Sequence, residues 1–243
     1  MLVYKYQKID EWFYKNLTNM EIFCNLPENF NDPFDCSIDI MNKSTGSILK
    51  KRNRDFIGLT KDAIIIDKVI KKAMNEIKKK SYVSCFTTTN NDELMWAHYS
   101  NSHKGVCIEY ELNEKEIEKV SYSEEYPVFS ERWINGVLNI NIGNREIFNE
   151  EFHLNYFQEF KEKFYLVKSK AWEYEEEWRI IQAKSIKKID KSQIKSIYFG
   201  LNTSEEDIKI VIKLLDDLEI KIPIYKMEKV NEKFLFEPKL IKN

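Results

Sequence analysis

The alternation and spacing of hydrophobic residues predict short strands mixed with a few helices. Alternating or continuous apolar runs predict strands that begin near Leu2, Met20, Tyr82, Gly105, Trp178, Ile194 and Ile222. Apolar residues three or four positions apart instead predict helices over 61–80, over 147–168 and from 203 to 218. Short strands interrupted by few helices indicate an α+β fold with a mixed, mostly antiparallel sheet and flanking helices.

The longest predicted helix carries phenylalanines along one side, at Phe148, Phe152, Phe157, Phe160 and Phe164. We expect this stripe to be buried against the sheet or against a second chain. Thr203 and Glu206 have the spacing of a capping box, which predicts where the next helix begins. No repeat, low-complexity segment or change in composition marks a domain boundary. We therefore predict one α+β domain over 1–243, with a helical insertion at about 145–169.

The composition is that of a globular protein without a strongly charged surface. Hydrophobic residues make up 43% of the 243 residues and charged residues 32%. The 38 basic and 40 acidic residues give a net charge of -2, which excludes a wholly basic nucleic-acid-binding surface. The four cysteines form no C-x-x-C pair and fit no zinc module. The first residues do not form a signal peptide, and no apolar run is long enough to span a membrane, so we expect a reduced, cytoplasmic protein without membrane contact.

The middle of the chain combines hydroxyl, imidazole and phenol groups within a few elements. Ser84 and Thr87 lie on the strand that begins at Tyr82, and a short helix ending in His98 and Tyr99 follows one turn later. Hydroxyls at a strand end beside a helix N-terminus predict an anion pocket. His98 and His103 are five positions apart, which is not the spacing of a helical metal-binding pair, and no third ligand is evident. We therefore expect no metal here.

An acidic run leads directly into a predicted strand, in the segment W-E-Y-E-E-E-W-R-I from 172 to 180. Strand alternation predicts that Glu175, Glu177 and Arg179 share one face. Two carboxylates placed in this way can orient a ribose hydroxyl and stabilise a cationic transition state. The alternative is a structural ion pair between Arg179 and one of the two acids.

Three further groups are candidates for binding a ligand. Alternation along the first strand places Tyr4 and Tyr6 on one face and Lys5 on the other. Turn-forming Asn31, Asp32 and Asp35, in F-N-D-P-F-D, either stabilise a loop or bind a ligand hydroxyl or a cation. A patch of lysines is either a plain surface or a contact for a phosphate backbone, at Lys184, Lys187, Lys188, Lys191 and Lys195.

Taken together, these motifs resemble a bacterial protein family of unknown function. The resemblance runs from residue 4 to about 200. It rests on Y-K-Y, F-N-D-P-F-D, S-C-F-T, M-W-A-H-Y, H-K-G-V-C-I-E and W-E-Y-E-E-E-W-R. It implies family membership and no particular activity.

A second resemblance is to the ADP-ribosyltransferase fold, carried by residues 81–112 and by the E-x-E segment that ends at Glu177. This resemblance implies NAD as the substrate, with Glu177 as the catalytic acid and Glu175 as its partner. It further implies that Ser84 and Thr87 lie along the nicotinamide-binding strand and that Tyr99 stacks near the ring. From their own positions in the sequence, Tyr4, Tyr6 and His98 are further candidates for cofactor binding. The candidates for contact with a substrate or ligand are Asn31, Asp32, Asp35, His103 and Arg179. The opening strand differs from such enzymes, which place Arg or His where this chain has Y-K-Y.

Three functions follow as hypotheses. The first is an NAD-consuming transferase of the ADP-ribosyltransferase type, as a toxin or phage-defence effector, with a nucleic acid or protein as acceptor and no metal. The second is a non-catalytic sensor module that binds a nucleotide, a nucleic acid or a protein. The third is a hydrolase or nuclease that uses His98 or His103 with an acid.

Overall fold

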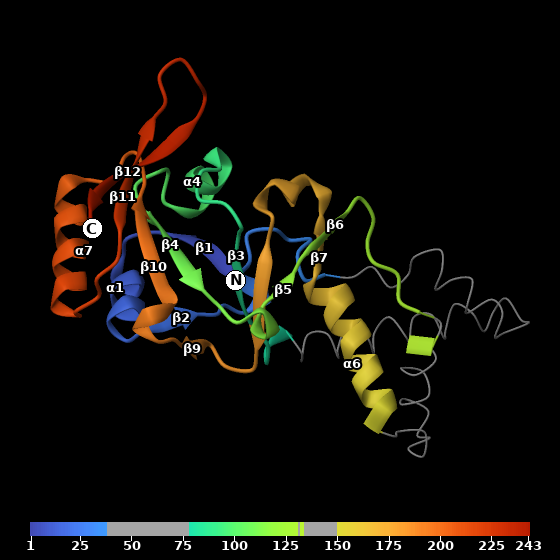
Figure 1. Cartoon of the computed structure of the whole chain (residues 1–243). Coiled ribbons are helices and arrows are strands. Elements are labelled where there is room, and N and C mark those ends of the chain that lie inside the picture. Colours follow the sequence, from blue (N-terminus) through green and yellow to red (C-terminus); the bar gives the residue numbers. More distant parts are fainter. Residues whose placement is uncertain (38–77, 131, 134–149) are drawn as a thin grey trace, which may run out of the picture. The chain divides into compact units, whose positions relative to one another are not determined.

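The computed structural model describes residues 1–37, 78–130, 132–133 and 150–243 (Figure 1). The chain divides into two compact units. Unit 1 comprises Met1–Asn25, Val83–Lys119 and Glu173–Asn243, and unit 2 comprises Leu26–Tyr82 and Val120–Trp172. The expected single domain with an insertion stays a prediction.

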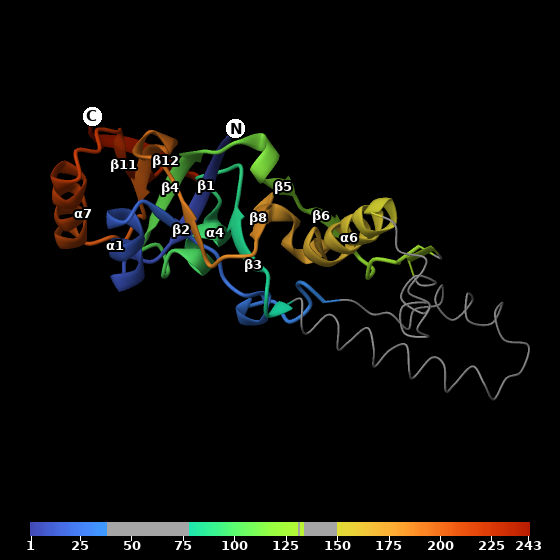
Figure 2. The same cartoon turned by 90° about the horizontal axis from the view of Figure 1, so that it is seen from below.

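Unit 1 is built on a five-stranded mixed sheet in the order β1-β4-β10-β11-β12. These strands are β1 (Leu2–Gln7), β4 (Val106–Glu111), β10 (Ile194–Phe199), β11 (Ile224–Lys229) and β12 (Phe236–Lys242). The pairs β1–β4, β4–β10 and β11–β12 are antiparallel, whereas β10 and β11 are parallel. A parallel pair needs a crossover, and helix α7 (Glu205–Asp217) supplies it. In both views α7 lies beside β11 (Figures 1 and 2).

Two smaller sheets and two further helices complete unit 1. The additional strands are β2 (Glu21–Phe23) with β9 (Ile186–Lys188), and β3 (Tyr82–Phe86) with β8 (Trp178–Gln182) and β5 (Glu118–Lys119). The helices are α1 (Glu11–Thr18) and α4 (Glu93–Tyr99), with 3₁₀ turns at Glu114–Glu116 and Lys191–Gln193. The 3₁₀ turn Lys170–Glu175 begins in unit 2 and ends in unit 1. The predicted α+β class with mixed and antiparallel sheets is therefore confirmed.

Helix α7 begins one residue later than the capping box predicts. Its N-cap is Ser204, whose Oγ accepts a hydrogen bond from the Asp207 backbone N–H at 3.1 Å. Thr203 is buried instead, and its hydroxyl donates to the Gly105 carbonyl at 2.9 Å. The prediction that Thr203 caps this helix is wrong, because the Thr203 hydroxyl satisfies a buried loop carbonyl elsewhere.

We expect Ser204→Ala to lower the free energy of unfolding by about 1 kcal/mol, because the Asp207 N–H loses its partner at the helix start. Ser204→Thr should retain most of the parent stability, since Thr keeps the hydroxyl that accepts from the Asp207 N–H and donates to Asp207 Oδ2. Urea unfolding of the three proteins checks this. Equal stability of Ser204→Ala and the parent would contradict the assignment.

Unit 2 contains helix α6 (Glu150–Tyr165) and the parallel pair β6 (Ser121–Ser123) and β7 (Val167–Ser169), with a 3₁₀ turn at Pro27–Asn29. On α6, Phe160 and Phe164 are buried, as the stripe predicts. Phe148 and the side chains of Phe152 and Phe157 lie outside the described residues, as does nearly all of the predicted helix 61–80. Within the described residues, no helix has the length and apolar character required to cross a membrane.

Candidate functional site

One side of the unit 1 sheet carries a cluster of aromatic side chains, which we call the aromatic face. Strand register places Tyr6, Cys107 and Tyr198 in one row across β1, β4 and β10, and Tyr225 of β11 continues this row. The Tyr198 and Tyr225 rings stack with centroids 4.9 Å apart. The aromatic face comprises the buried Tyr6, Trp96 and Tyr198, with the half-buried Tyr4, Tyr99, Tyr174, Tyr225 and Phe236.

Helix α4 covers part of the aromatic face. The Asp92 carboxylate caps the helix by accepting from the Met95 N–H at 2.8 Å. Trp96 is fully buried, donates through Nε1 to the Asn90 carbonyl at 2.8 Å, and meets Tyr6 edge-on at 5.0 Å. With Trp96 fixed in the core, Tyr99 lies at the helix end and is half-buried, whereas His98 is exposed.

Tyr99 contacts the acidic segment directly. Its hydroxyl donates to Glu175 Oε1 at 2.6 Å, and only 3% of Glu175 is exposed. Glu175 does not belong to the strand, however. It ends the 3₁₀ turn, Glu176 has a left-handed φ of 44°, and β8 begins at Trp178. The predicted alternation of Glu175 with Glu177 is therefore wrong, because the left-handed residue between them interrupts the extended backbone.

A second carboxylate on the aromatic face was not singled out from the sequence. The Tyr4 hydroxyl donates to Glu109 Oε1 at 2.8 Å, and Ser196 Oγ donates to the other oxygen of Glu109. Burial, together with the neighbouring Glu109 charge, raises the pKa of Tyr4 well above its usual value, so the phenol stays protonated. The sequence did contain a signal for this residue. The alternation of V-C-I-E-Y-E places Glu109 on the same face of the strand as Cys107.

Glu177 and Arg179 form a buried ion pair. Arg179 Nε and Nη2 donate to the two Glu177 oxygens at 2.7 and 2.9 Å, and the residues are 2% and 0% exposed. The Cys85 thiol also hydrogen-bonds to Glu177, and burial raises the pKa of that thiol. The paired guanidinium provides the compensation that a buried carboxylate requires.

Lys5 lies on the face of β1 opposite to Tyr4 and Tyr6. With Ser84, Glu177 and Arg179 it forms what we call the buried charged cluster. Its ammonium donates to Ser84 Oγ at 2.9 Å and to the Cys85 carbonyl at 3.1 Å, and it lies 5.1 Å from the Phe86 ring centroid. Burial lowers the pKa of Lys5. Seven of the residues predicted from the sequence thus fall into two groups. Tyr4, Tyr6, Tyr99 and Glu175 belong to the aromatic face or contact it, and Ser84, Glu177 and Arg179 belong to the buried charged cluster.

Thr87 and His103 have mainly structural contacts. Thr87 is fully buried and exchanges both backbone hydrogen bonds with Tyr4, at 2.8 and 2.9 Å. His103 has a left-handed φ of 65° and meets Phe236 edge-on at 5.4 Å, and burial lowers its pKa. In the described part of the chain, no group of three His, Cys, Asp or Glu side chains is arranged to hold a metal ion.

The F-N-D-P-F-D loop belongs to unit 2. Asn31 is exposed, whereas Asp32 and Asp35 are buried. Asp32 Oδ1 accepts from the Phe34 N–H at 2.9 Å, which is the turn geometry that the sequence suggests. Asp35 Oδ2 lies 3.8 Å from Lys168 Nζ.

Residues 95–180 match the model of a protein family described as Protein of unknown function (DUF2971). The prediction of a family of unknown function is thereby confirmed over this segment. The match includes the M-W-A-H-Y, H-K-G-V-C-I-E and W-E-Y-E-E-E-W-R motifs. Tyr99 lies near the beginning of the matched segment and Glu175 near its end, and the two residues are in contact. No curated protein and no solved structure matches the chain.

Proposed function

We propose that unit 1 binds a nucleotide on its aromatic face, with Glu175 accepting a hydrogen bond from a ribose hydroxyl. The observation that carries this proposal is the Tyr99–Glu175 hydrogen bond beside half-buried tyrosine rings. Flat, partly exposed rings bind nucleobases by stacking, and a carboxylate is a strong acceptor for sugar hydroxyls. A ribose hydroxyl would join or replace the Tyr99 hydroxyl on Glu175.

The buried charged cluster supports different roles for Glu175 and Glu177. Glu177 is held by Arg179 in a water-free setting, so we assign it the role of positioning the segment that ends in Glu175. Glu175, which already has a hydroxyl partner on a neighbouring element, is the acid that we assign to the ligand.

Our second candidate function is cleavage of NAD by an ADP-ribosyltransferase-type reaction. It is favoured by the contact of Glu175 with Tyr99, because the resemblance assigns these residues to the catalytic pair and the nicotinamide site. In that reaction the bond between nicotinamide and ribose breaks, and a carboxylate stabilises the positive charge that develops on the sugar. An acceptor nucleophile, or water, then takes the ADP-ribose.

We expect Glu175→Gln and Tyr99→Phe to weaken NAD binding by about tenfold, as measured by isothermal titration. Glu175→Gln replaces the charged acceptor of the ribose hydroxyl with a neutral amide, and Tyr99→Phe removes the hydroxyl that holds the Glu175 carboxylate in place. The matched control is Glu173→Gln, an exposed acid of the same segment, which should bind like the parent. Absence of binding by NAD, ATP and ADP at about millimolar concentrations would overturn the proposal.

Nicotinamide release, measured by chromatography, separates the two candidates. If the parent releases nicotinamide and Glu175→Gln does so at least about a hundredfold more slowly, the result supports the ADP-ribosyltransferase-type reaction. This loss corresponds to about 2.7 kcal/mol of transition-state stabilisation. Binding without release supports the non-catalytic module. Release that is unchanged in Glu175→Gln contradicts the assigned role of this carboxylate.

A further inference from the structure

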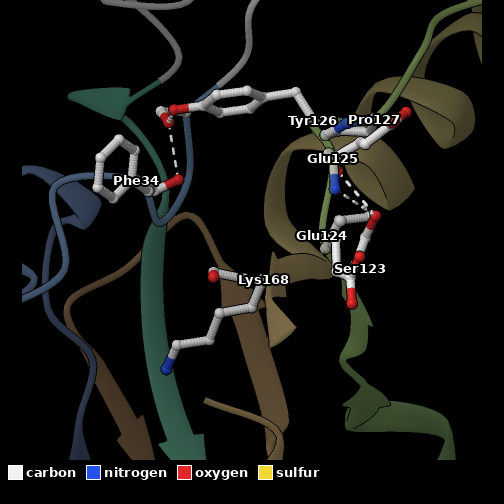
Figure 3. Close-up of a pocket in the computed structure, with 10 residues that line it drawn as sticks. Phe34, Ser123, Glu124, Glu125, Tyr126, Pro127 and Lys168 are labelled. Carbon is white, nitrogen blue, oxygen red and sulfur yellow. Dashed lines mark hydrogen bonds between the residues drawn. The ribbon is translucent and has the colours of Figure 1, made fainter. Parts of the chain in front are cut away.

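Unit 2 contains a cavity of about 250 Å³ that the function proposed for unit 1 does not involve. Figure 3 shows Phe34 on one side and Tyr126 above it, with Ser123, Glu124 and Glu125 opposite and Lys168 below. The floor comes from β7 and the wall from the end of β6 and the residues that follow it. Such a volume suits a group the size of one side chain.

Two aromatic residues that line this cavity are exposed. Phe34 is 62% exposed and Tyr126 39% exposed. Their centroids lie 6.5 Å apart, and the ring planes are inclined by 58°. The two rings are not stacked in parallel, and because both are exposed they do not belong to a closed core. Inclined ring faces that line a small cavity are instead the arrangement that attracts a compact cation through the negative charge of each ring face.

The charges around the cavity also favour a cation. The Lys168 ammonium points away from the Phe34 and Tyr126 rings (Figure 3). Lys168 is buried, and its Nζ lies 3.8 Å from Asp35 Oδ2 and 5.0 Å from the centroid of the Trp172 ring. A carboxylate and an aromatic face therefore offset the charge of this ammonium. The same unit thus already contains an ammonium held by a ring and an acid.

The remaining charged groups of the cavity lining are Glu124 and Glu125. Glu124 lies 3.6 Å from Lys170, but the two side chains are 79% and 55% exposed, and solvent screens such a pair strongly. The exposed Glu125 adds a second negative charge at the wall.

We propose that this cavity binds an organic ammonium group between Phe34 and Tyr126, with Glu124 and Glu125 supplying the opposite charge. The ligand group that we expect is an alkylated or primary ammonium about the size of an amino-acid side chain. A free choline-like molecule and a lysine side chain of a polypeptide are the two sources that carry it.

Choline and its neutral isostere 3,3-dimethylbutan-1-ol provide the first test, because they share shape and differ in charge. NMR titration of the full chain should give choline binding with an affinity at least about tenfold above that of the isostere. Equal binding of the two compounds would show a merely apolar pocket and overturn the proposal. Absence of choline, trimethyllysine and lysine binding up to about 10 mM would overturn it as well.

Substitutions of the two aromatic residues test whether choline binds in this cavity. Phe34→Ala and Tyr126→Ala should each weaken choline binding by about tenfold, whereas Tyr126→Phe keeps the ring and should bind like the parent. Phe34 is largely exposed, so its truncation leaves the core intact, and circular dichroism confirms folding. The matched control is Phe234→Ala, a fully exposed phenylalanine of unit 1. Parent-like affinity in both Phe34→Ala and Tyr126→Ala would place the ligand elsewhere and overturn the proposal.

A peptide with a single lysine, in unmodified and trimethylated forms, identifies the source. Tighter binding of either peptide than of choline, lost in Phe34→Ala, supports a polypeptide partner. Tighter binding of choline supports a small molecule. NAD binding by unit 1 should be unchanged in Phe34→Ala, so the failure of one proposal is distinguishable from the failure of the other.

Discussion

Replacing Arg179 with methionine should lower the free energy of unfolding by about 3–5 kcal/mol. The substitution leaves the Glu177 carboxylate buried without its guanidinium partner, and an uncompensated charge in a water-free site is costly. Chemical denaturation followed by circular dichroism measures the loss. If the units unfold separately, the effect should appear in the transition of unit 1, to which both residues belong.

Two controls separate burial from charge. The double variant Glu177→Leu with Arg179→Met should recover much of the lost stability, because two apolar groups replace the pair and no buried charge remains. Lys239→Met removes the exposed partner of Glu228 and should change stability by less than about 0.5 kcal/mol. A change below about 1 kcal/mol in Arg179→Met would mean that water reaches Glu177. That result would return Glu177 to the list of candidate ligand contacts.

Truncation of Phe164 to alanine should destabilise unit 2 by about 3–5 kcal/mol. Phe164 is fully buried on α6, lies 5.0 Å from the Phe160 ring in a stacked arrangement, and meets Tyr165 edge-on at 4.7 Å. Removing the ring forfeits its transfer free energy and leaves a cavity among aromatic neighbours that cannot collapse fully. Denaturant unfolding measures the effect.

The matched control for Phe164→Ala is Val128→Ala, which truncates an apolar but exposed residue of the same unit. We expect a change of less than about 0.5 kcal/mol there. Similar unfolding curves for Phe164→Ala and the parent would contradict the placement of this ring in the core. They would favour a stripe that is covered only by another chain.

The first strand illustrates what local sequence can predict. Alternation placed Tyr4 and Tyr6 on one side of β1 and Lys5 on the other, and the structure confirms both placements. The phenylalanine spacing along 147–168 likewise predicted that Phe160 and Phe164 are buried. These features follow from the repeat of the backbone itself, which is two residues in a strand and 3.6 in a helix.

The acidic segment illustrates where that reasoning ends. No Gly or Pro between Glu175 and Glu177 signals an interruption of the extended backbone. The left-handed backbone at Glu176 nevertheless interrupts it, so the two carboxylates have different partners. Ser204, rather than Thr203, caps α7 because a carbonyl about a hundred residues away in the chain, at Gly105, takes the Thr203 hydroxyl.

From the sequence alone, the α+β class, most strands and the likeness to a family of unknown function were accessible, because each depends on neighbouring residues or on short motifs. Tertiary structure alone decided which of the clustered acids meets which partner. Tyr99 and Glu175 are 76 positions apart, and Tyr4 and Glu109 are 105 apart. Contacts over such separations depend on how the strands pair and where each loop turns, and the local pattern of polar and apolar residues does not encode either.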